Sequence, residues 1–271
     1  MKISISKIII LVFVGVFSIS FQAQNFSGKA VYMSKSKMEL GNWGARMSEA
    51  QKKQIAERLK NRLEKTYVLN FNKQEASFVE DVKIDAISGA TDSWGSYFSR
   101  GNQYKNISEN KIVQAQEFYG KWFLIKDKLY KIDWTIGTET KQIGNYTCFK
   151  AKAFVPYKEL NWYNFSWGDL RKPKEEKGQE QEGKMVIVEA WYTPQIPLAH
   201  GPAEFWGLPG FILEVSAQNT TLLCTEIVIN KNEVVAIKPP KKGLEITKAK
   251  YAETIKAKML DMRNNRGRRR G

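Results

Sequence analysis

Apolar and polar residues alternate with a period of two along most of this sequence, and no other feature constrains its fold as strongly. Such alternation indicates β-strands with one buried and one exposed face. The pattern begins at residues 30–33 and continues through 67–71 and 76–79, the last two flanking a predicted hairpin turn at Asn72 and Lys73. Short connections favour antiparallel neighbours, because parallel pairs need long crossovers. The other predicted strands are residues 103–107, 111–118, 121–125, 129–134, 146–155, 185–193, 211–217, 222–229 and 233–237.

Two segments have helical spacing instead. Residues 48–65 open with Ser48 and Gln51, the arrangement of a capping box, and residues 247–263 form a second amphipathic segment. We expect both helices to cover the sheet, although the second, being basic, could instead lie on a membrane surface. The apolar stripe of the first is Ile55, Leu59 and Leu63, and that of the second is Tyr251, Ile255, Met259 and Met262.

These elements predict a mainly β protein of the α+β class. We expect a single antiparallel, strongly curved sheet covered by one or two helices, with a two-sheet β-sandwich as the alternative. The chain has 271 residues, of which 12% are aromatic, enough to bury the core of one domain. We place this domain at residues 24–262.

The first 23 residues have the pattern of a secretory signal peptide. Lys2 and Lys7 form a basic start, residues 8–17 are apolar, and Ala23 offers a small residue for cleavage. The apolar run is short for a membrane span, although an uncleaved N-terminal anchor is the alternative. We therefore expect an exported protein that begins near Gln24.

Cys148 and Cys224 are the only cysteines. After export they would meet an oxidising compartment, where a disulfide can persist and contribute about 4 kcal/mol if its geometry is relaxed. We predict this bridge because both residues lie in strand-like runs that could be neighbours. Two separately buried thiols are the alternative.

The formal net charge of +15 is concentrated at the C-terminal end. Between Lys238 and Gly271 there are twelve Lys or Arg and three acidic residues, a net +9. Residues 263–271 contain no aromatic side chain, whereas nucleic-acid binding calls for cations interleaved with aromatics. We expect a disordered basic tail that meets solvent or an anionic membrane surface, and no nucleic-acid partner.

One further stretch breaks the strand pattern. Residues 168–184 are charged and almost free of apolar residues, which predicts a loop. The preceding residues 160–167 are aromatic. We expect either a lid packed on the sheet or a partner surface.

The sequence lacks recognisable catalytic and metal-binding patterns. His200 is the single histidine, which excludes His-rich zinc sites. There is no HExxH, GxSxG, P-loop or dinucleotide-binding motif. We predict no catalytic residue, no metal and no cofactor. A hydrolase or peptidase centred on His200 and Glu204 is the weaker alternative.

Residues 189–215 form the most distinctive stretch. A predicted strand ends at Thr193, and three prolines with Gly201 then fix an extended, turn-rich segment. The sequence 208–211 suits a type II turn, with Gly210 accepting a positive φ. We expect a rigid connector whose aromatic side chains cap the core, with a ligand site as the alternative. The candidate binding residues are Trp191, Tyr192, His200, Glu204, Phe205 and Trp206, and the structural turn is Gly207, Leu208, Pro209 and Gly210.

The run Gly207-Leu208-Pro209-Gly210-Phe211-Ile212 resembles the signature of the GLPGLI family, an envelope family of unknown biochemical function. Phe211 replaces the leucine usual there, and the charged loop before Lys184 looks like an insertion. The flanking Trp191-Tyr192-Thr193, Ile196-Pro197, Gly201-Pro202 and Phe205, and upstream Trp134, Glu139-Thr140-Lys141, Ile143, Tyr146, Cys148, Lys150 and Ala151, are also similar to the family pattern.

The resemblance implies a signal-bearing, mostly β protein of the periplasm or outer-membrane periphery, associated with TonB-dependent uptake, and it supplies no catalytic residue. We therefore expect an extracytoplasmic binding or accessory protein whose partner is an outer-membrane transport or envelope protein. A periplasmic carrier of lipid or another hydrophobic ligand is the alternative, because a curved sheet permits an apolar concave face.

Overall fold

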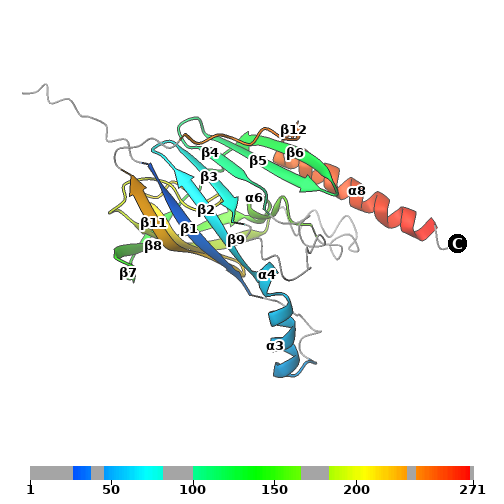
Figure 1. Cartoon of the computed structure of the whole chain (residues 1–271), viewed down its shortest axis with the longest axis horizontal. Coiled ribbons are helices and arrows are strands. Elements are labelled where there is room, and N and C mark those ends of the chain that lie inside the picture. The colour runs from blue at the N-terminus through cyan, green and yellow to red at the C-terminus, as the bar shows by residue number, and fades with distance from the viewer. Residues whose placement is uncertain (1–26, 38–45, 82–99, 166–182, 231–235, 269–271) are drawn as a thin grey trace, which may run out of the picture.

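The chain folds around one large open sheet. The computed structural model describes residues 27–37, 46–81, 100–165, 183–230 and 236–268. Twelve strands are hydrogen-bonded in the order β12-β6-β5-β4-β3-β2-β1-β11-β10-β9-β8-β7 (Figure 1). The prediction of a mainly β protein with a single curved sheet is confirmed. The strands are β1 (Ser27–Ser36), β2 (Glu64–Phe71), β3 (Glu75–Glu80), β4 (Gln103–Asn106), β5 (Lys111–Phe118), β6 (Lys121–Lys128), β7 (Thr135–Ile143), β8 (Tyr146–Pro156), β9 (Met185–Thr193), β10 (Phe211–Ala217), β11 (Thr220–Asn230) and β12 (Leu244–Ile246).

Ten of the strand pairings are antiparallel, and one is not. At one edge of the sheet β12 runs parallel to β6, so the prediction of a purely antiparallel sheet is wrong there. The chain reaches this edge by a long connection from β11 rather than by a hairpin, and a long connection permits the parallel direction. In the middle of the sheet β1 pairs with both β2 and β11, which places the first described strand between elements far apart in the sequence.

Most predicted strands are present, three of them with the predicted bounds. The exceptions lie near the sheet edges. Residues 129–134 are not a strand, and their alternation instead reflects a connector that buries Leu129 and Ile132. The edge strands β7 and β12 were not predicted, because both are largely exposed and so lack an apolar alternation. The predicted strand at 233–237 lies largely outside the described residues.

The sheet curves so that β4, β5 and β6 lie above β8 and β9 in Figure 1, and its inner face carries the core. Tyr32, Tyr67 and Phe78 come from three adjacent strands and are buried together on this face. The rings of Tyr67 and Phe78 are stacked with centroids 4.7 Å apart. Offset-stacked aromatic pairs of this kind contribute about 0.5–1.5 kcal/mol beyond the area they bury.

Helix α8 (Lys248–Arg268) covers the β6 end of the sheet and runs on beyond it (Figure 1). Tyr251, Ile255 and Met259 are each 0% exposed, and the Tyr251 ring meets Phe123 of β6 edge to face at 5.3 Å. The predicted stripe is thus confirmed. The backbone stays helical through Arg268, within the segment for which we predict a disordered tail.

The N-terminal helical segment behaves differently. It divides into α3 (Glu49–Arg58) and α4 (Lys60–Leu63), and the predicted capping box at Ser48 and Gln51 is present. However, α3 has no buried residue and projects away from the sheet (Figure 1), so the expectation that it covers the sheet is wrong. Its apolar stripe has too few residues for packing against the sheet to stabilise the fold.

The predicted signal peptide lies outside the described residues, as does nearly all of the predicted charged loop. Within the described ranges no helix is both long and apolar enough to cross a bilayer.

Candidate functional site

The proline-rich segment (residues 194–210) is folded into the inner face of the sheet. Most of the predicted binding residues are therefore buried, with His200 at 0%, Tyr192 and Phe205 at 4% and Glu204 at 6% exposed. Trp191 faces the other side of β9, where the amines of Lys141 and Lys150 lie 4.9 and 5.5 Å from its ring centroid. The structure thus buries four of these residues, while Trp191 is partly buried and packs at the margin of the same core.

Lys105 of β4 holds the proline-rich segment from beneath. Its side chain is 1% exposed, and its Nζ donates to the backbone carbonyls of Gly201, Ala203 and Phe205 at 2.5, 3.0 and 3.0 Å. Burial lowers the pKa of Lys105 to about 7, opposed by the charge of Glu204. Three carbonyl acceptors require three N–H donors, which only the ammonium form provides. No sequence pattern indicated this contact.

A second buried charge secures the same segment. Arg100 donates to Glu204 and to the Tyr163 hydroxyl, the latter at 2.9 Å. The Glu204 carboxylate raises the pKa of the Arg100 guanidinium against the effect of burial. Because both partners are largely removed from water, losing either would leave an uncompensated buried charge. Only Oε1 of Glu204 takes part in this pair, and its Oε2 is buried without a partner among the described residues.

His200 lies at the centre of this cluster. Neither ring nitrogen has a hydrogen-bond partner of normal geometry among the described residues. Burial, together with the nearby charge of Lys105, lowers the pKa of His200 to about 3, although the backbone of Asn72 and Lys73 partly opposes the shift. The imidazole is consequently neutral and closed off from solvent.

The turn at residues 207–210 has a different geometry from the predicted type II turn. Gly210 does not have a positive φ, whereas Gly207 does, at +92°. The Gly210 N–H donates to the Leu208 carbonyl at 2.8 Å, which closes a tighter turn around Pro209. Gly210 is needed for space instead, because a Cβ there would lie 2.3 Å from the Thr193 carbonyl oxygen.

Tryptophans fasten the connector before β7 to the proline-rich segment. The Trp134 indole donates to the Trp206 carbonyl at 2.8 Å, and the Trp206 indole donates to the Tyr130 carbonyl at 2.9 Å. Phe211, where the segment enters β10, is 0% exposed and packs against Phe71 with ring centroids 4.8 Å apart. The proline-rich segment is therefore held by side chains from the segment before β4, from β4 itself and from the connector before β7.

Cys148 and Cys224 are both buried and free, so the predicted disulfide is absent from the structure. The prediction assumed that their strands were neighbours. In the sheet, β9 and β10 lie between β8 and β11. Each thiol instead donates to a carbonyl of its own strand, Cys148 to Tyr146 and Cys224 to Glu226.

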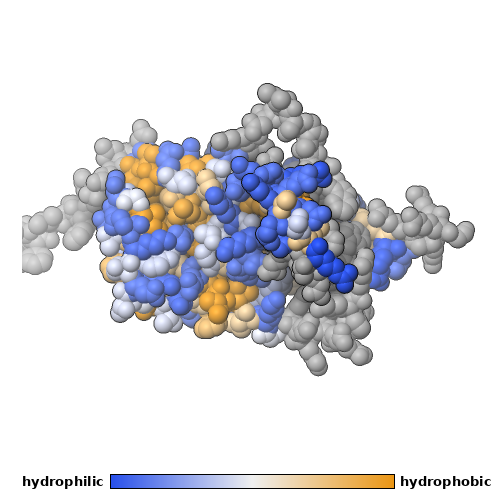
Figure 2. Space-filling view, turned by 90° about the horizontal axis from the view of Figure 1, so that it is seen from below, coloured by the Kyte–Doolittle hydropathy of each residue, from blue (hydrophilic) through white to orange (hydrophobic). Residues whose placement is uncertain are grey.

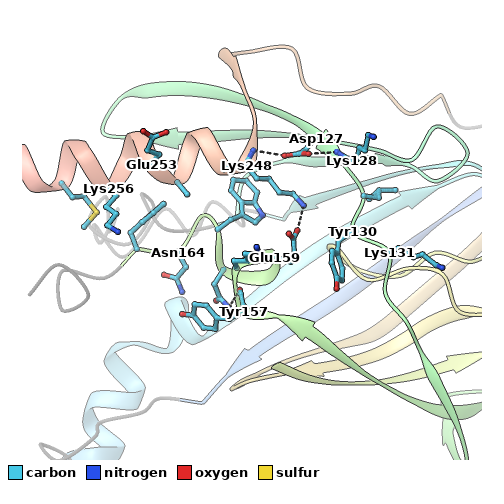
Figure 3. Close-up of a pocket in the computed structure, with 18 residues that line it drawn as sticks. Asp127, Lys128, Tyr130, Lys131, Tyr157, Glu159, Asn164, Lys248, Glu253 and Lys256 are labelled. Atoms are coloured by element: carbon cyan, nitrogen blue, oxygen red, sulfur yellow. Dashed lines mark hydrogen bonds and ion pairs between the residues drawn. The ribbon is translucent and has the colours of Figure 1, made fainter. Parts of the chain in front are cut away.

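A pocket of about 750 Å³ lies elsewhere, between α6 (Tyr157–Asn161), the first turns of α8 and the connection from β6 to β7 (Figure 3). This volume is in the range of small-molecule sites. Its walls combine aromatic and small apolar side chains with lysines. The apolar lining is Leu129, Tyr130, Tyr157, Trp162, Phe165, Ala249, Ala252 and Met259.

An ion pair and a helix cap join the two sides of this pocket. Lys248 of α8 lies 3.3 Å from the Glu159 carboxylate of α6, with side chains only 10% and 25% exposed. The Asp127 carboxylate accepts the backbone N–H of Lys248 at 3.0 Å and so caps the start of α8. Both interactions are drawn in Figure 3. These two interactions fix the position of α8 relative to α6 and to the end of β6.

Sequence reasoning found only part of this pocket. The aromatic stretch at 160–167 was predicted to be a lid or a partner surface, and Trp162 and Phe165 from it do line the pocket. The other walls come from α8 and from the segment after β6, about 90 and 35 positions away in the sequence. No spacing rule connects residues that far apart.

The outer face of β8 and β9 also exposes apolar side chains. Phe154 and Ile187 are a cross-strand pair, 66% and 56% exposed, and Met185 beside them is 48% exposed. Figure 2, the view from below, shows apolar areas over the sheet that are interrupted by hydrophilic side chains. The exposed apolar residues of this face are few, and no pocket is found among them in the described part of the chain.

Fold and site together define a mainly β protein with an open twelve-stranded sheet, a clamped internal connector and one aromatic-lined pocket. A family described as "Protein of unknown function (Porph_ging)" matches residues 134–214, a range that holds β7, β8, β9, the proline-rich segment and the start of β10. No curated protein matches the chain.

Two solved structures are loosely similar in fold. "Structure of PNGF-II in C2 space group" has a TM-score of 0.48 and 13% identity, and "Structure of PNGF-II in P21 space group" has a TM-score of 0.46 and 12% identity. Each alignment covers 85% of this chain and 32% of the other. The chain therefore spans about a third of the length of these proteins.

Proposed function

We propose that this chain is a non-enzymatic binding protein of the bacterial envelope and that its ligand occupies the pocket between α6 and α8. The observation that carries the proposal is the pocket of about 750 Å³ with walls fixed by the Lys248–Glu159 pair. Preformed, aromatic-lined concavities of this size are the usual sites of small-ligand binding.

The proline-rich segment is assigned a structural role in this proposal. Its His200, Glu204 and Phe205 are buried, and each of its polar anchors already has a partner within the protein or is closed off from water. A hydrolase centred on His200 would need the imidazole within reach of a substrate. The buried, neutral ring argues for the binding protein instead.

The cellular location and the family membership are proposed from the sequence. The basic and apolar pattern of residues 1–23 supports export, and the resemblance of residues 207–212 supports membership of the GLPGLI family. Attachment to an outer-membrane transport system is part of the same proposal.

A carrier of lipid or another hydrophobic ligand is the second candidate. The proline-rich segment and Phe211 fill the inner face of the sheet, so such a ligand would have to enter the pocket. Trp162 and Met259 are buried beneath it and give it an apolar floor.

A pocket-filling substitution tests the proposal. Ala252 of α8 lines the pocket, whereas Ala257 of the same helix is exposed and does not. We expect native mass spectrometry of the exported protein to show a co-purifying ligand that is lost in Ala252→Trp and retained in Ala257→Trp. Partner proteins captured from envelope extracts should likewise be lost with Ala252→Trp and retained with Ala257→Trp. Equal ligand and partner recovery with both variants would overturn the pocket as the binding site.

A further inference from the structure

We infer that the ligand of the α6–α8 pocket is an oxyanion carried on an apolar body. This inference rests on the proposed function and adds the chemistry of the ligand. It follows from the balance of hydrogen-bond donors, acceptors and charges that line the pocket.

The charge balance favours an anion. Five lysines and three carboxylates line the pocket, a net charge of +2. The carboxylates are already engaged within the protein. Glu159 pairs with Lys248, Glu253 pairs with Lys250, and Asp127 accepts the backbone N–H groups of Lys248 and of its neighbour Lys128. Each carboxylate therefore already has a partner within the protein before any ligand enters.

Three of the lysines have no such partner. Lys128, Lys158 and Lys256 make no ion pair with any residue in the described part of the chain. Figure 3 shows Lys256 reaching from α8 on the side of Asn164, while Glu253 points from the other side of the helix. Unpaired ammonium groups around a partly desolvated concavity raise the local concentration of anions.

A buried hydrogen-bond donor also favours an anionic ligand. Trp162 is 6% exposed, and its Nε1–H has no hydrogen-bond partner among the described residues. An indole nitrogen can only donate, and leaving it buried without an acceptor is costly. Lys248, 8% exposed, has one carboxylate partner for its three ammonium protons. The pocket thus offers donors that an acceptor-rich group would satisfy.

The aromatic lining indicates the rest of the ligand. Tyr130, Tyr157 and Phe165 line the walls around the Trp162 indole. A small hydrated ion would make no use of this apolar lining. An apolar ring or chain that bears a carboxylate, phosphate or sulfonate would meet both the rings and the donors.

A matched pair of fluorescent probes tests the requirement for the anion. 8-Anilinonaphthalene-1-sulfonate carries a sulfonate, and N-phenyl-1-naphthylamine has the same ring body without it. We expect the sulfonate probe to bind at least about 10-fold more tightly, which is the scale of a few partly exposed charge interactions. Raising the salt concentration should weaken the binding of the sulfonate probe only.

Substitutions of single lysines test whether the lysines of the pocket cause the preference for the sulfonate probe. Lys256→Gln should weaken the sulfonate probe by about 2- to 5-fold and leave the neutral probe unchanged. Lys29→Gln removes the same charge at an exposed position of β1 and should change neither. Displacement by dodecyl phosphate would indicate a chain-bearing ligand, and displacement by phenyl phosphate a ring-bearing one.

The outcomes separate the two proposals. Equal affinity for both probes, or equal effects of Lys256→Gln and Lys29→Gln, overturns the oxyanion inference, while loss of both probes in Ala252→Trp would still support the pocket. If Ala252→Trp and Ala249→Trp, checked for folding by thermal unfolding, bind both probes like the unchanged protein, the pocket itself is refuted.

Discussion

The single histidine makes the stability of this protein depend on pH in a way that the structure determines. His200 is 0% exposed, and its pKa is lowered to about 3 because burial and the charge of Lys105 disfavour the imidazolium. In the unfolded chain the pKa of a histidine is about 6.5. Below that pH the unfolded state binds a proton that the folded state does not.

The sign and size of the effect follow from this difference. The pKa of His200 is lower in the folded state than in the unfolded chain. Its contribution to the free energy of unfolding is therefore fully present above about pH 6.5 and is lost as the pH falls toward about 3. Between pH 8 and pH 5 the free energy of unfolding should fall by about 2 kcal/mol from His200 alone, since each unit below the unfolded pKa costs about 1.4 kcal/mol. No other imidazole contributes, as the chain contains one histidine.

Urea unfolding followed by tryptophan fluorescence measures this loss. His200→Phe is the matched variant, because it keeps an aromatic ring and removes the group that titrates. We expect the free energy of unfolding to drop by about 2 kcal/mol more in the unchanged protein than in the variant between pH 8 and pH 5. Carboxylates and Lys105, whose pKa of about 7 lies in the same pH range, titrate in both proteins and cancel. The same pH slope in both proteins would refute a neutral, buried His200.

Three further substitutions probe the clamp on the proline-rich segment by urea unfolding. Lys105→Met leaves three buried carbonyls without their donor and should cost about 3–5 kcal/mol; a loss below about 1 kcal/mol would contradict the clamp. Gly210→Ala forces a Cβ to 2.3 Å from the Thr193 oxygen and should cost about 1–3 kcal/mol, whereas Gly183→Ala, which has open space, should stay within about 0.5 kcal/mol. Trp134→Phe removes one indole hydrogen bond and should cost about 1 kcal/mol, with no change expected if that bond does not form.

Local patterns predicted much of the fold. Alternation located β9 because one of its faces lies against the core and the other is more exposed. β5 and β10 were also located with the predicted bounds, although most of their residues are buried on both faces. The stripe of α8 was correct because Tyr251, Ile255 and Met259 meet β6 at every turn. The same rule failed for residues 129–134, where Leu129 and Ile132 are buried without forming a strand. A period of two indicates which side chains are buried, but a buried side chain can belong to a strand or to a connection.

Non-local contacts explain what the sequence did not predict. The lysine that clamps the proline-rich segment lies about 100 positions before it, in a short strand that shows no charge pattern. The pocket likewise assembles Trp162, Asp127 and Lys248 from three separate parts of the chain. The expected disulfide failed for a related reason, because strand order in the sheet, not strand character, decides which cysteines are adjacent.

The position of β1 sets the order in which this chain can fold. Ser27 is opposite Asn230, so the pairing of β1 with β11 must wait, as the polypeptide is made, until nearly the whole sequence exists. The strands from β1 to β6 can pair with their neighbours in the sequence, but joining β1 to β11 closes a loop of about 200 residues, a slow and entropically expensive step. Until that step β1 and β11 each have an open strand edge, and open edges are the sites where an incompletely folded chain would associate with copies of itself.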